Sequence, residues 1–333
     1  MAQAQADIGV VGAGVMGLAA SLLLVEAGYR VTVVAQHFAG DLTPDWTSPW
    51  AGALLAPHPD AGFPDLQENS LKRWHKMRRE CRDAGIEERH IYEYYDNRKD
   101  LSSIWYKRMY LDLTAIPKEG LVSEAQIGFK YRGLIVDPNA FLPWITRLLK
   151  EKGVKFIQRR ISSLDELNSI TGATIVVNAS GLGARELAND EKVHAVRGQT
   201  MFVPCDSRNM DRVTIHQGSH YTYAIPRIAS GGVILGGVAQ PDNYSREVDP
   251  TTRDDIMRRV NELTRGQFSW VNPKGAIIKD IVGFRPARTG GIRVEREDRV
   301  IHAYGLGALG YVFAFGAAEK VVSLVQEVNR AKI

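Results

Sequence analysis

Cysteine is almost absent from the 333 residues, and neither sign of charge dominates them. Only Cys81 and Cys205 occur, far apart and in no metal-like spacing, so a disulfide framework is excluded and no metal site is expected. The 42 Lys and Arg residues against 38 Asp and Glu leave a net charge of +4, and basic residues are interleaved with acidic ones. We therefore expect no nucleic-acid partner, although a mildly basic balance suits an anionic cofactor or substrate.

Repeats, low-complexity tracts and an obvious linker are also lacking. The chain is long enough for one large domain or two moderate ones. The run from Ile8 to Val25 is apolar and uncharged, which raises the alternative of a membrane span. Three glycines near its start, and Asp7 where a signal peptide would be basic, favour a strand, a turn and a packed helix instead. We expect no membrane association.

The first 35 residues follow a strand–helix–strand pattern. A buried strand at 8–11 precedes a glycine turn and a helix to about Ala27, and a second strand spans 29–35. The residues from 43 to 62 favour loop. Further helices are expected at 67–84, 141–152, 254–264 and 310–329, and further strands at 154–159, 174–177, 199–204, 221–226, 233–237 and just before the last glycine-rich turn.

The turn Gly12-Ala13-Gly14-Val15-Met16-Gly17 has the spacing of a dinucleotide-binding fingerprint. Gly12 permits the bend, Gly14 lets backbone approach a pyrophosphate, and Gly17 lets the helix pack on the strand. The acidic residue that usually binds the ribose is missing, and Gln36 and His37 follow the second strand instead. By itself the motif does not distinguish FAD from NAD, or either from a packing turn without a ligand.

Seven segments in order resemble the D-amino-acid oxidase/D-aspartate oxidase family over nearly the whole chain. They are GAGVMGL at the start, SPWAGA (48–53), VVNASGLGA (176–184), VRGQ (196–199), YAIPR (223–227), GFRPAR-GG-RVE (283–295) and HAYGLGALGY (302–311). The resemblance implies an α/β fold with an α+β second domain. A Rossmann-like FAD-binding domain would be assembled from residues 1–56, 140–196 and 281–333, and a mixed-sheet substrate domain from 57–139 and 197–280.

The resemblance also implies non-covalent FAD and a set of residues that contact it. It implies a peroxisomal address, for which Ala331-Lys332-Ile333 has the small–basic–aliphatic pattern read by the import receptor, with the cytoplasm as the alternative. A homo-oligomer is compatible with the sequence, which does not determine the oligomeric state. The expected cofactor residues are Gly12, Ala13, Gly14, Met16, Gly17, Gln36, His37, Ser48, Gly52, Ala53, Leu54, Ser180, Gly181, Gly305, Gly307, Ala308, Leu309, Gly310 and Tyr311.

Three residues match the family's substrate-binding positions. Arg285 would bind the α-carboxylate through two parallel bonds, a geometry that suits arginine. Tyr223 would reach the same carboxylate with its hydroxyl, and the backbone carbonyl of Ala308 would accept the amine. The alternatives are an ordinary ion pair for Arg285, as for Arg288, and a half-buried strand tyrosine for Tyr223.

By resemblance, the reaction is hydride transfer from a D-amino acid to the flavin, with O2 as acceptor and a 2-oxo acid, ammonia and hydrogen peroxide as products. His58 stands where the aspartate branch tends to carry histidine, and His216 stands where that branch has an arginine that binds the side chain. We therefore expect acidic substrates, with neutral D-amino acids as the alternative. Ala239 speaks against the acidic preference because an arginine is expected there. Two other functions stay open, a glycine- or sarcosine-type flavin oxidase and a non-catalytic flavin-binding module.

Overall fold

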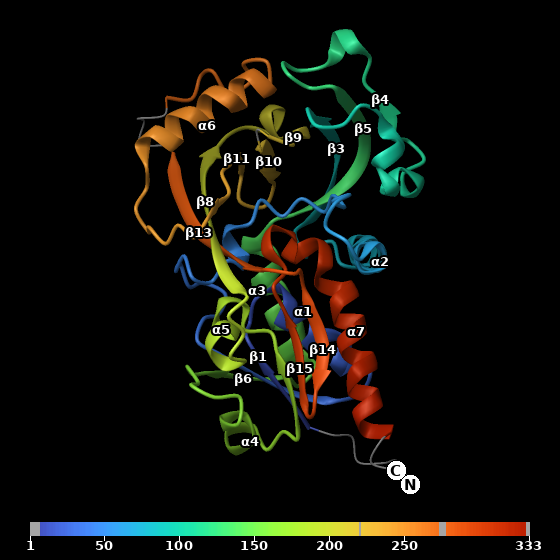
Figure 1. Cartoon of the computed structure of the whole chain (residues 1–333), viewed down its shortest axis with the longest axis vertical. Helices are drawn as coiled ribbons and strands as arrows, with labels where there is room; N and C mark the ends of the chain where they lie inside the picture. Colours follow the sequence, from blue (N-terminus) through green and yellow to red (C-terminus); the bar gives the residue numbers. More distant parts are fainter. Residues whose placement is uncertain (1–6, 220, 273–277, 331–333) are drawn as a thin grey trace.

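Two β-sheets, each covered by helices, make up the protein (Figure 1). The structure, a computed structural model, describes residues 7–219, 221–272 and 278–330, so the tripeptide Ala331–Ile333 lies outside the described residues. The first sheet has six strands and the second has nine. This arrangement confirms the predicted α/β class with a mixed second sheet.

The six-stranded sheet has the order β14-β15-β7-β1-β2-β6, and only the edge strand β14 is antiparallel to its neighbour. Side chains alternate along a strand, so Val10 and Val33 face one layer of helices while Val11 and Val34 face the other. The strands are β1 (Asp7–Val11), β2 (Arg30–Ala35), β6 (Lys155–Gln158), β7 (Ile175–Asn178), β14 (Arg293–Glu297) and β15 (Val300–Tyr304).

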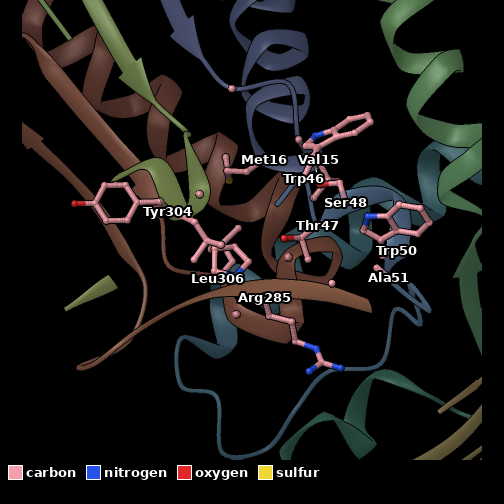
Figure 2. A pocket seen from close by; sticks show the side chains of 18 of the residues that line it. Val15, Met16, Trp46, Thr47, Ser48, Trp50, Ala51, Arg285, Tyr304 and Leu306 are labelled. Atoms are coloured by element: carbon pink, nitrogen blue, oxygen red, sulfur yellow. Dashed lines mark hydrogen bonds between the residues drawn. The ribbon is translucent and has the colours of Figure 1, made fainter. Parts of the chain in front are cut away.

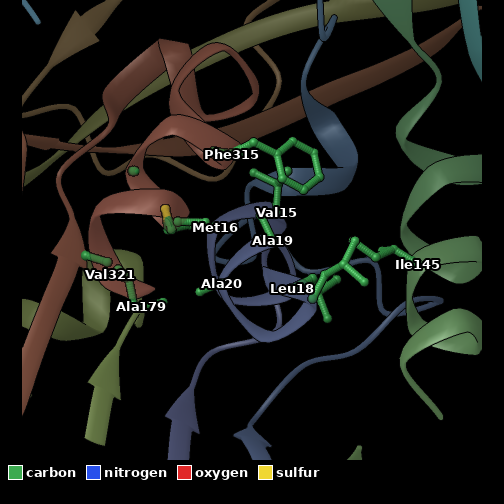
Figure 3. Close-up of a cluster of buried hydrophobic side chains, with 14 of the residues drawn as sticks. Val15, Met16, Leu18, Ala19, Ala20, Ile145, Ala179, Phe315 and Val321 are labelled. Atoms are coloured by element: carbon green, nitrogen blue, oxygen red, sulfur yellow. The ribbon is translucent and has the colours of Figure 1, made fainter. Parts of the chain in front are cut away.

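Helices α1 (Val15–Glu26), α3 (Pro138–Glu151) and α7 (Gly310–Arg330) share one core with one face of this sheet, and α4 (Glu166–Thr171) packs on the other. Figure 3 shows the tight side-chain packing around α1, where Leu18 meets Ile145 of α3 and Val15 lies beside Phe315 of α7. The apolar run at the N-terminus is therefore β1 and a helix buried nearly all round. Residues 307–328 are long and apolar enough to cross a membrane, but 61% of that window is buried and α7 packs against α1 and α2 (Pro64–Glu80).

The nine-stranded sheet has the order β12-β8-β11-β10-β9-β3-β5-β4, and β13 pairs with β8 on a side branch. Helix α6 (Pro250–Leu263) packs on one face, with Met201, Val203 and Leu235 beneath it. The strands are β3 (Ile86–Tyr95), β4 (Thr114–Ala115), β5 (Ile127–Val136), β8 (Val193–Pro204), β9 (Arg212–Gln217), β10 (Thr222–Arg227), β11 (Gly232–Gly236), β12 (Gln240–Pro241) and β13 (Lys279–Arg288).

The chain passes repeatedly between the two sheets. Residues 7–35, 155–178 and 293–304 supply the first sheet, and residues 86–136 and 193–288 supply the second. The predicted domain limits at 196/197 and 280/281 fall inside β8 and β13. These two strands form a long antiparallel pair that reaches from the second sheet toward the first (Figure 1). The short helix α5 (Ala184–Leu187) lies where this pair ends.

Several predicted boundaries were wrong for identifiable reasons. Helices α3 and α6 begin at Pro138 and Pro250, three and four residues earlier than predicted. In each, the preceding aspartate accepts a backbone N–H of the first turn, a capping pair that the sequence shows openly. Helix α2 begins at Pro64 and ends at Glu80 rather than spanning 67–84. Strands β3 and β5 were missed because charged side chains interrupt their apolar patterns, Glu87 to Arg89 in β3 and Lys130 and Arg132 in β5.

Candidate active site

A cavity of about 390 Å³ lies between the two sheets and is lined by segments from both. At one end are the turn after β1 and the residues that follow β2 and β6. At the other end are β8, β9, β10 and β13 of the nine-stranded sheet. Figure 2 shows Met16 and Val15 on one side of this cavity and the Arg285 side chain extending from β13 on another. The cavity thus joins the predicted cofactor turn to Arg285 and Tyr223, the predicted substrate clamp.

The turn after β1 depends on two glycines. Gly12 has φ +102°, and a Cβ there would collide with the carbonyl oxygen of Ala179 at the end of β7. A Cβ on Gly17 would collide with the carbonyl oxygen of Gly12, so this glycine lets α1 approach the strand. Gly17 does not line the cavity, in keeping with the packing role expected of it.

The N-terminus of α1 opens on the cavity. Its first turn contains no acidic side chain, and the backbone N–H of Val15 donates to Ser48 Oγ at 3.0 Å. Free N–H groups and the helix dipole make such a terminus suited to an anion. These features, with the glycine turn against them, fit the pyrophosphate of FAD.

The cofactor end of the cavity also contains two arginines that were not predicted from the sequence. Gln36 and His37 line the cavity as predicted from their place after β2, and His37 Nδ1 lies 3.3 Å from Asp41 Oδ2. Arg159 and Arg160 line it too, directly after β6. Since β6 is parallel to β2, both strand ends meet at one edge of the sheet, and that topology could have predicted these arginines.

All predicted cofactor residues except Gly17 line this cavity, and they come from five separate segments. Near its middle, the hydroxyl of Tyr311 at the start of α7 donates to the carbonyl oxygen of Ser48 at 3.0 Å. The members are Gly12, Ala13, Gly14, Met16, Gln36, His37, Ser48, Gly52, Ala53, Leu54, Ser180, Gly181, Gly305, Gly307, Ala308, Leu309, Gly310 and Tyr311. Their individual contacts with a cofactor stay predictions.

At the substrate end, the Arg285 guanidinium has no acidic partner among the described residues. Its Nη1 donates to the carbonyl oxygen of Val238 at 2.9 Å and weakly to that of Arg197. A Cβ on Gly198 would lie 2.6 to 2.8 Å from the guanidinium, so the glycine provides the space that the group occupies. A partly buried cation without a counter-ion is suited to binding an anion such as a carboxylate.

Tyr223 on β10 lies beside this guanidinium. Burial raises the pKa of the Tyr223 hydroxyl, and the positive charge and hydrogen bond of Arg285 oppose the shift. The hydroxyl therefore stays protonated at neutral pH and can donate a hydrogen bond. The residues opposite it on β11 and just beyond, Gly236 and Gly237, leave room for the ring.

The remaining predicted residues divide into two groups. Ala308 lines the cavity in the glycine-rich turn before α7. His58 and His216 do not line it. His58 is held by Gln67, whose Oε1 accepts the His58 backbone N–H at 2.8 Å. His216 pairs with Thr222, and alternation along the strands turns both to the face that α6 covers, where Arg259 contacts the Thr222 hydroxyl.

Arg288, the second arginine of the same motif, has a structural role. Its Nε donates to Asp190 Oδ2 at 2.8 Å, and Tyr304 donates to the same oxygen. Further lining residues that the sequence analysis missed are Trp46, Thr47, Trp50, Ile215, Gln217, Tyr221, Ile225 and Ile281. Trp50 and Ile225 lie inside the SPWAGA and YAIPR segments, whereas no local motif marks the others, which share only a face of the second sheet or a place in its adjoining loop.

A family model of FAD-dependent oxidoreductases matches residues 7–324 of the chain. The chain therefore belongs to the D-amino-acid oxidase (DAO) family of FAD-dependent oxidoreductases, whose cofactor is FAD. Among curated relatives, it is 33% identical to a D-amino-acid oxidase of Schizosaccharomyces pombe over 96% of this chain and 95% of that protein. It is 30% identical to the D-aspartate oxidase of Homo sapiens over 97% and 95%.

Solved structures support the same fold at lower identity. L-proline dehydrogenase from P. horikoshii has a TM-score of 0.78 at 15% identity, covering 97% of this chain and 94% of that one. Glycine oxidase from Bacillus cereus has a TM-score of 0.76 at 18% identity, covering 97% and 98%. L-α-glycerophosphate oxidase from Mycoplasma pneumoniae, solved with FAD bound, has a TM-score of 0.71 at 15% identity, covering 97% and 95%.

Proposed function

We propose that the protein catalyses the oxidative deamination of D-amino acids. The observation that carries the proposal is the Arg285 guanidinium, which lacks an acidic partner among the described residues and lies with Tyr223 in the cavity that starts at the Gly12 turn. A protein that only bound a flavin would need no such clamp. In the balanced reaction, a D-amino acid, O2 and water give a 2-oxo acid, ammonia and hydrogen peroxide.

Each residue of the substrate end has a part in orienting the amino acid. Arg285 would bind the α-carboxylate with two N–H groups, and Tyr223 would donate its hydroxyl to the same group. The backbone carbonyl of Ala308 would accept a hydrogen bond from the amine. The residues of the glycine turn would hold FAD, which would supply the two-electron acceptor for the Cα hydride and the route of the electrons to O2. The protein's contribution is orientation and exclusion of water, which needs no acid–base residue at the reacting carbon.

D-amino acids with uncharged side chains are the better-supported substrates, although the sequence favoured acidic D-amino acids. A second carboxylate calls for a second cation, and Arg285 is the only cation among the described residues that line the substrate end. The side chains of Ile215, Ile225 and Ile281 line it as well. The relatives named above include both a D-amino-acid oxidase and a D-aspartate oxidase, which leaves both preferences within the family.

We also propose that FAD is held without a covalent bond. Neither Cys81 nor Cys205 lines the cavity, so no thiol is available there for a flavin link. Precipitation of the purified protein with acid should release the flavin into the supernatant. Flavin that stays with the pellet would contradict this part of the proposal.

The decisive experiment is a peroxide assay of the flavin-loaded protein. The substrates should be D-Ala, D-Phe, D-Asp, D-Glu, glycine, sarcosine and the L-enantiomers. We expect turnover of D-amino acids and none of their L-enantiomers. Activity confined to glycine and sarcosine would replace the proposal with the secondary-amine alternative, and a yellow protein inert toward every substrate would support the non-catalytic one.

A further inference from the structure

A buried carboxylate stands behind the wall of the substrate end. Glu93 on β3 has no exposed surface, and its two oxygens accept four hydrogen bonds. The donors are Tyr95 at 2.8 Å, Tyr106 at 2.9 Å, Tyr131 at 3.0 Å and Gln217 at 3.0 Å. None of the steps proposed above uses this group.

No lysine, arginine or histidine forms an ion pair with Glu93 in the part of the chain that the structure describes. Three hydroxyl groups and one amide N–H can satisfy an ionised carboxylate, which accepts and does not donate. Burial raises the pKa of this carboxyl, and the four hydrogen bonds oppose the shift. These four hydrogen bonds, with no cation beside them, are what the fold offers to an ionised carboxyl, and burial outweighs them, so the pKa of Glu93 lies above its ordinary value.

Gln217 connects this carboxylate to the cavity. In the parallel pair of β3 and β9, Glu93 is in register with Ile215, and Tyr95 with Gln217. Ile215 and Gln217 both line the cavity, so Glu93 lies on the cavity face of the sheet, one strand farther out. The Gln217 amide nitrogen donates to Glu93, which leaves the amide oxygen as the acceptor that this side chain can present to a ligand.

We propose that Gln217, held in this orientation by Glu93, selects against D-amino acids with a side-chain carboxylate and favours uncharged side chains that donate a hydrogen bond. The inference rests on the proposed oxidase function. Two effects act in the same direction: the Gln217 oxygen accepts from an amide or hydroxyl but repels a carboxylate, and Glu93, when ionised at alkaline pH, adds like-charge repulsion in a poorly hydrated region. Gln217 touches the substrate, and Glu93 is a positioning residue.

D-Asn and D-Asp test this inference because their side chains have nearly the same shape. In peroxide assays at pH 8, we expect the wild-type kcat/KM for D-Asn to exceed that for D-Asp by at least about tenfold. Glu93→Gln keeps the shape and removes the charge, so the D-Asn to D-Asp ratio should fall several-fold through a gain on D-Asp. Gln217→Leu should lower the same ratio through a loss on D-Asn.

The matched control is Glu88→Gln, the same substitution on the same strand. Glu88 pairs with Arg132 at the surface, 2.8 Å away, and lies outside the cavity lining, so this variant should keep the wild-type ratio. Flavin content and thermal melting of each variant establish that it is folded. If Glu93→Gln fails to fold, Gln217→Leu alone carries the test, because it leaves the three tyrosine donors to Glu93 in place.

The outcomes separate this inference from the proposed function. A flavin-loaded wild-type protein that oxidises no D-amino acid, D-Ala included, would contradict the function itself. Turnover of D-Ala together with equal or faster turnover of D-Asp than of D-Asn would overturn only the inference. So would a high wild-type ratio that a folded Gln217→Leu variant retains, since the ratio would then be determined elsewhere. A purely structural role for Glu93 would change melting without changing the ratio.

Discussion

The two ends of the cavity are built in different ways. At the cofactor end, the turn from Gly12 to Gly17 and the start of α1 present backbone N–H groups and small side chains. At the substrate end, side chains from β9, β10 and β13 meet, among them Gln217, Tyr223 and Arg285. The glycine turn is one contiguous stretch, although four other segments complete the cofactor end, whereas the substrate end is made by strands that lie far apart in the chain, with Gln217 and Arg285 separated by 68 positions.

This difference predicts how substitutions at each end affect cofactor binding and substrate preference. A backbone surface tolerates few substitutions because any Cβ alters its shape, but it distinguishes ligands coarsely. A side-chain surface can be altered one residue at a time, and each residue changes affinity for one part of the substrate. Substitutions at the cofactor end should therefore lower flavin content and affect all substrates alike. Those at the substrate end should leave flavin content normal, and those that face the substrate side chain should separate the substrates.

The largest effect is expected for Gly12→Val. Gly12 has φ +102°, and a left-handed conformation of a β-branched residue costs about 1–3 kcal/mol before the collision with Ala179 is counted. The variant should purify with little flavin and lose activity on every substrate, as measured by flavin absorbance and peroxide production. Normal flavin content would break the comparison, because the turn would then not depend on its backbone.

Arg285→Ala comes next. Loss of two charge-assisted hydrogen bonds, together about 3–4 kcal/mol, should lower kcat/KM by roughly 10²- to 10³-fold on all D-amino acids while flavin content stays normal. Arg285→Lys should retain an intermediate activity, because a lysine keeps the charge but lacks the planar fork.

Arg288→Gln is the counterpart, since Arg288 pairs with Asp190 outside the clamp. It should lower the melting temperature and leave KM close to that of the wild type. A steep rise in KM for Arg288→Gln but not for Arg285→Ala would mean that the clamp has been assigned to the wrong arginine.

A smaller effect is expected for Arg197→Met, because Arg197 supports the substrate end from outside the cavity lining. The buried Arg197 guanidinium donates to Ser245 O and Gln240 Oε1, both at 2.8 Å, and so ties down the segment after β12. Leaving these acceptors without a partner should cost about 2–4 kcal/mol, or about 3–6 °C in melting temperature. Calorimetry measures the loss, and unchanged melting would show that the segment does not need this anchor.

The smallest effect concerns His302 on β15, in the cofactor half. Burial and the nearby Arg293 lower the pKa of His302 from its ordinary value of 6.5, while Glu297 opposes the shift. Below about pH 6.5 the unfolded chain takes up a proton there that the folded protein does not, so stability falls as the pH falls through this window. Thermal melts at pH 7.5 and 5.5 should show a loss about 1–2 °C smaller in His302→Asn than in the wild type. An equal loss in both would assign the acid sensitivity to other groups.

Much of the first sheet could be predicted, and much of the second could not. Strands β1 and β2 and helix α1 are local and apolar, and their limits lie within a residue or two of those predicted from the sequence. Strand β3 has four consecutive polar residues, Glu87 to His90, which hide its period of two, and its pairing with β9 joins residues more than 100 positions apart. The side-chain role of His216 failed to find support for a similar reason, since a one-residue step along β9 decides which face a residue occupies. His58 lies in the loop before α2, where its backbone is bound to Gln67.

By itself, the sequence indicated the family and the cofactor through seven segments in order, and the position of the dinucleotide turn through its glycine spacing. Glycine spacing and strand–helix–strand periodicity are local properties that survive without knowledge of distant contacts. Only the tertiary structure decided that Arg285 has a neighbour in Tyr223 and that Arg288 is paired with Asp190. The same holds for Gln217, which lies between the cavity and the buried Glu93. Those relations depend on strand register and on which face each side chain occupies, and both are fixed by pairing across the whole second sheet.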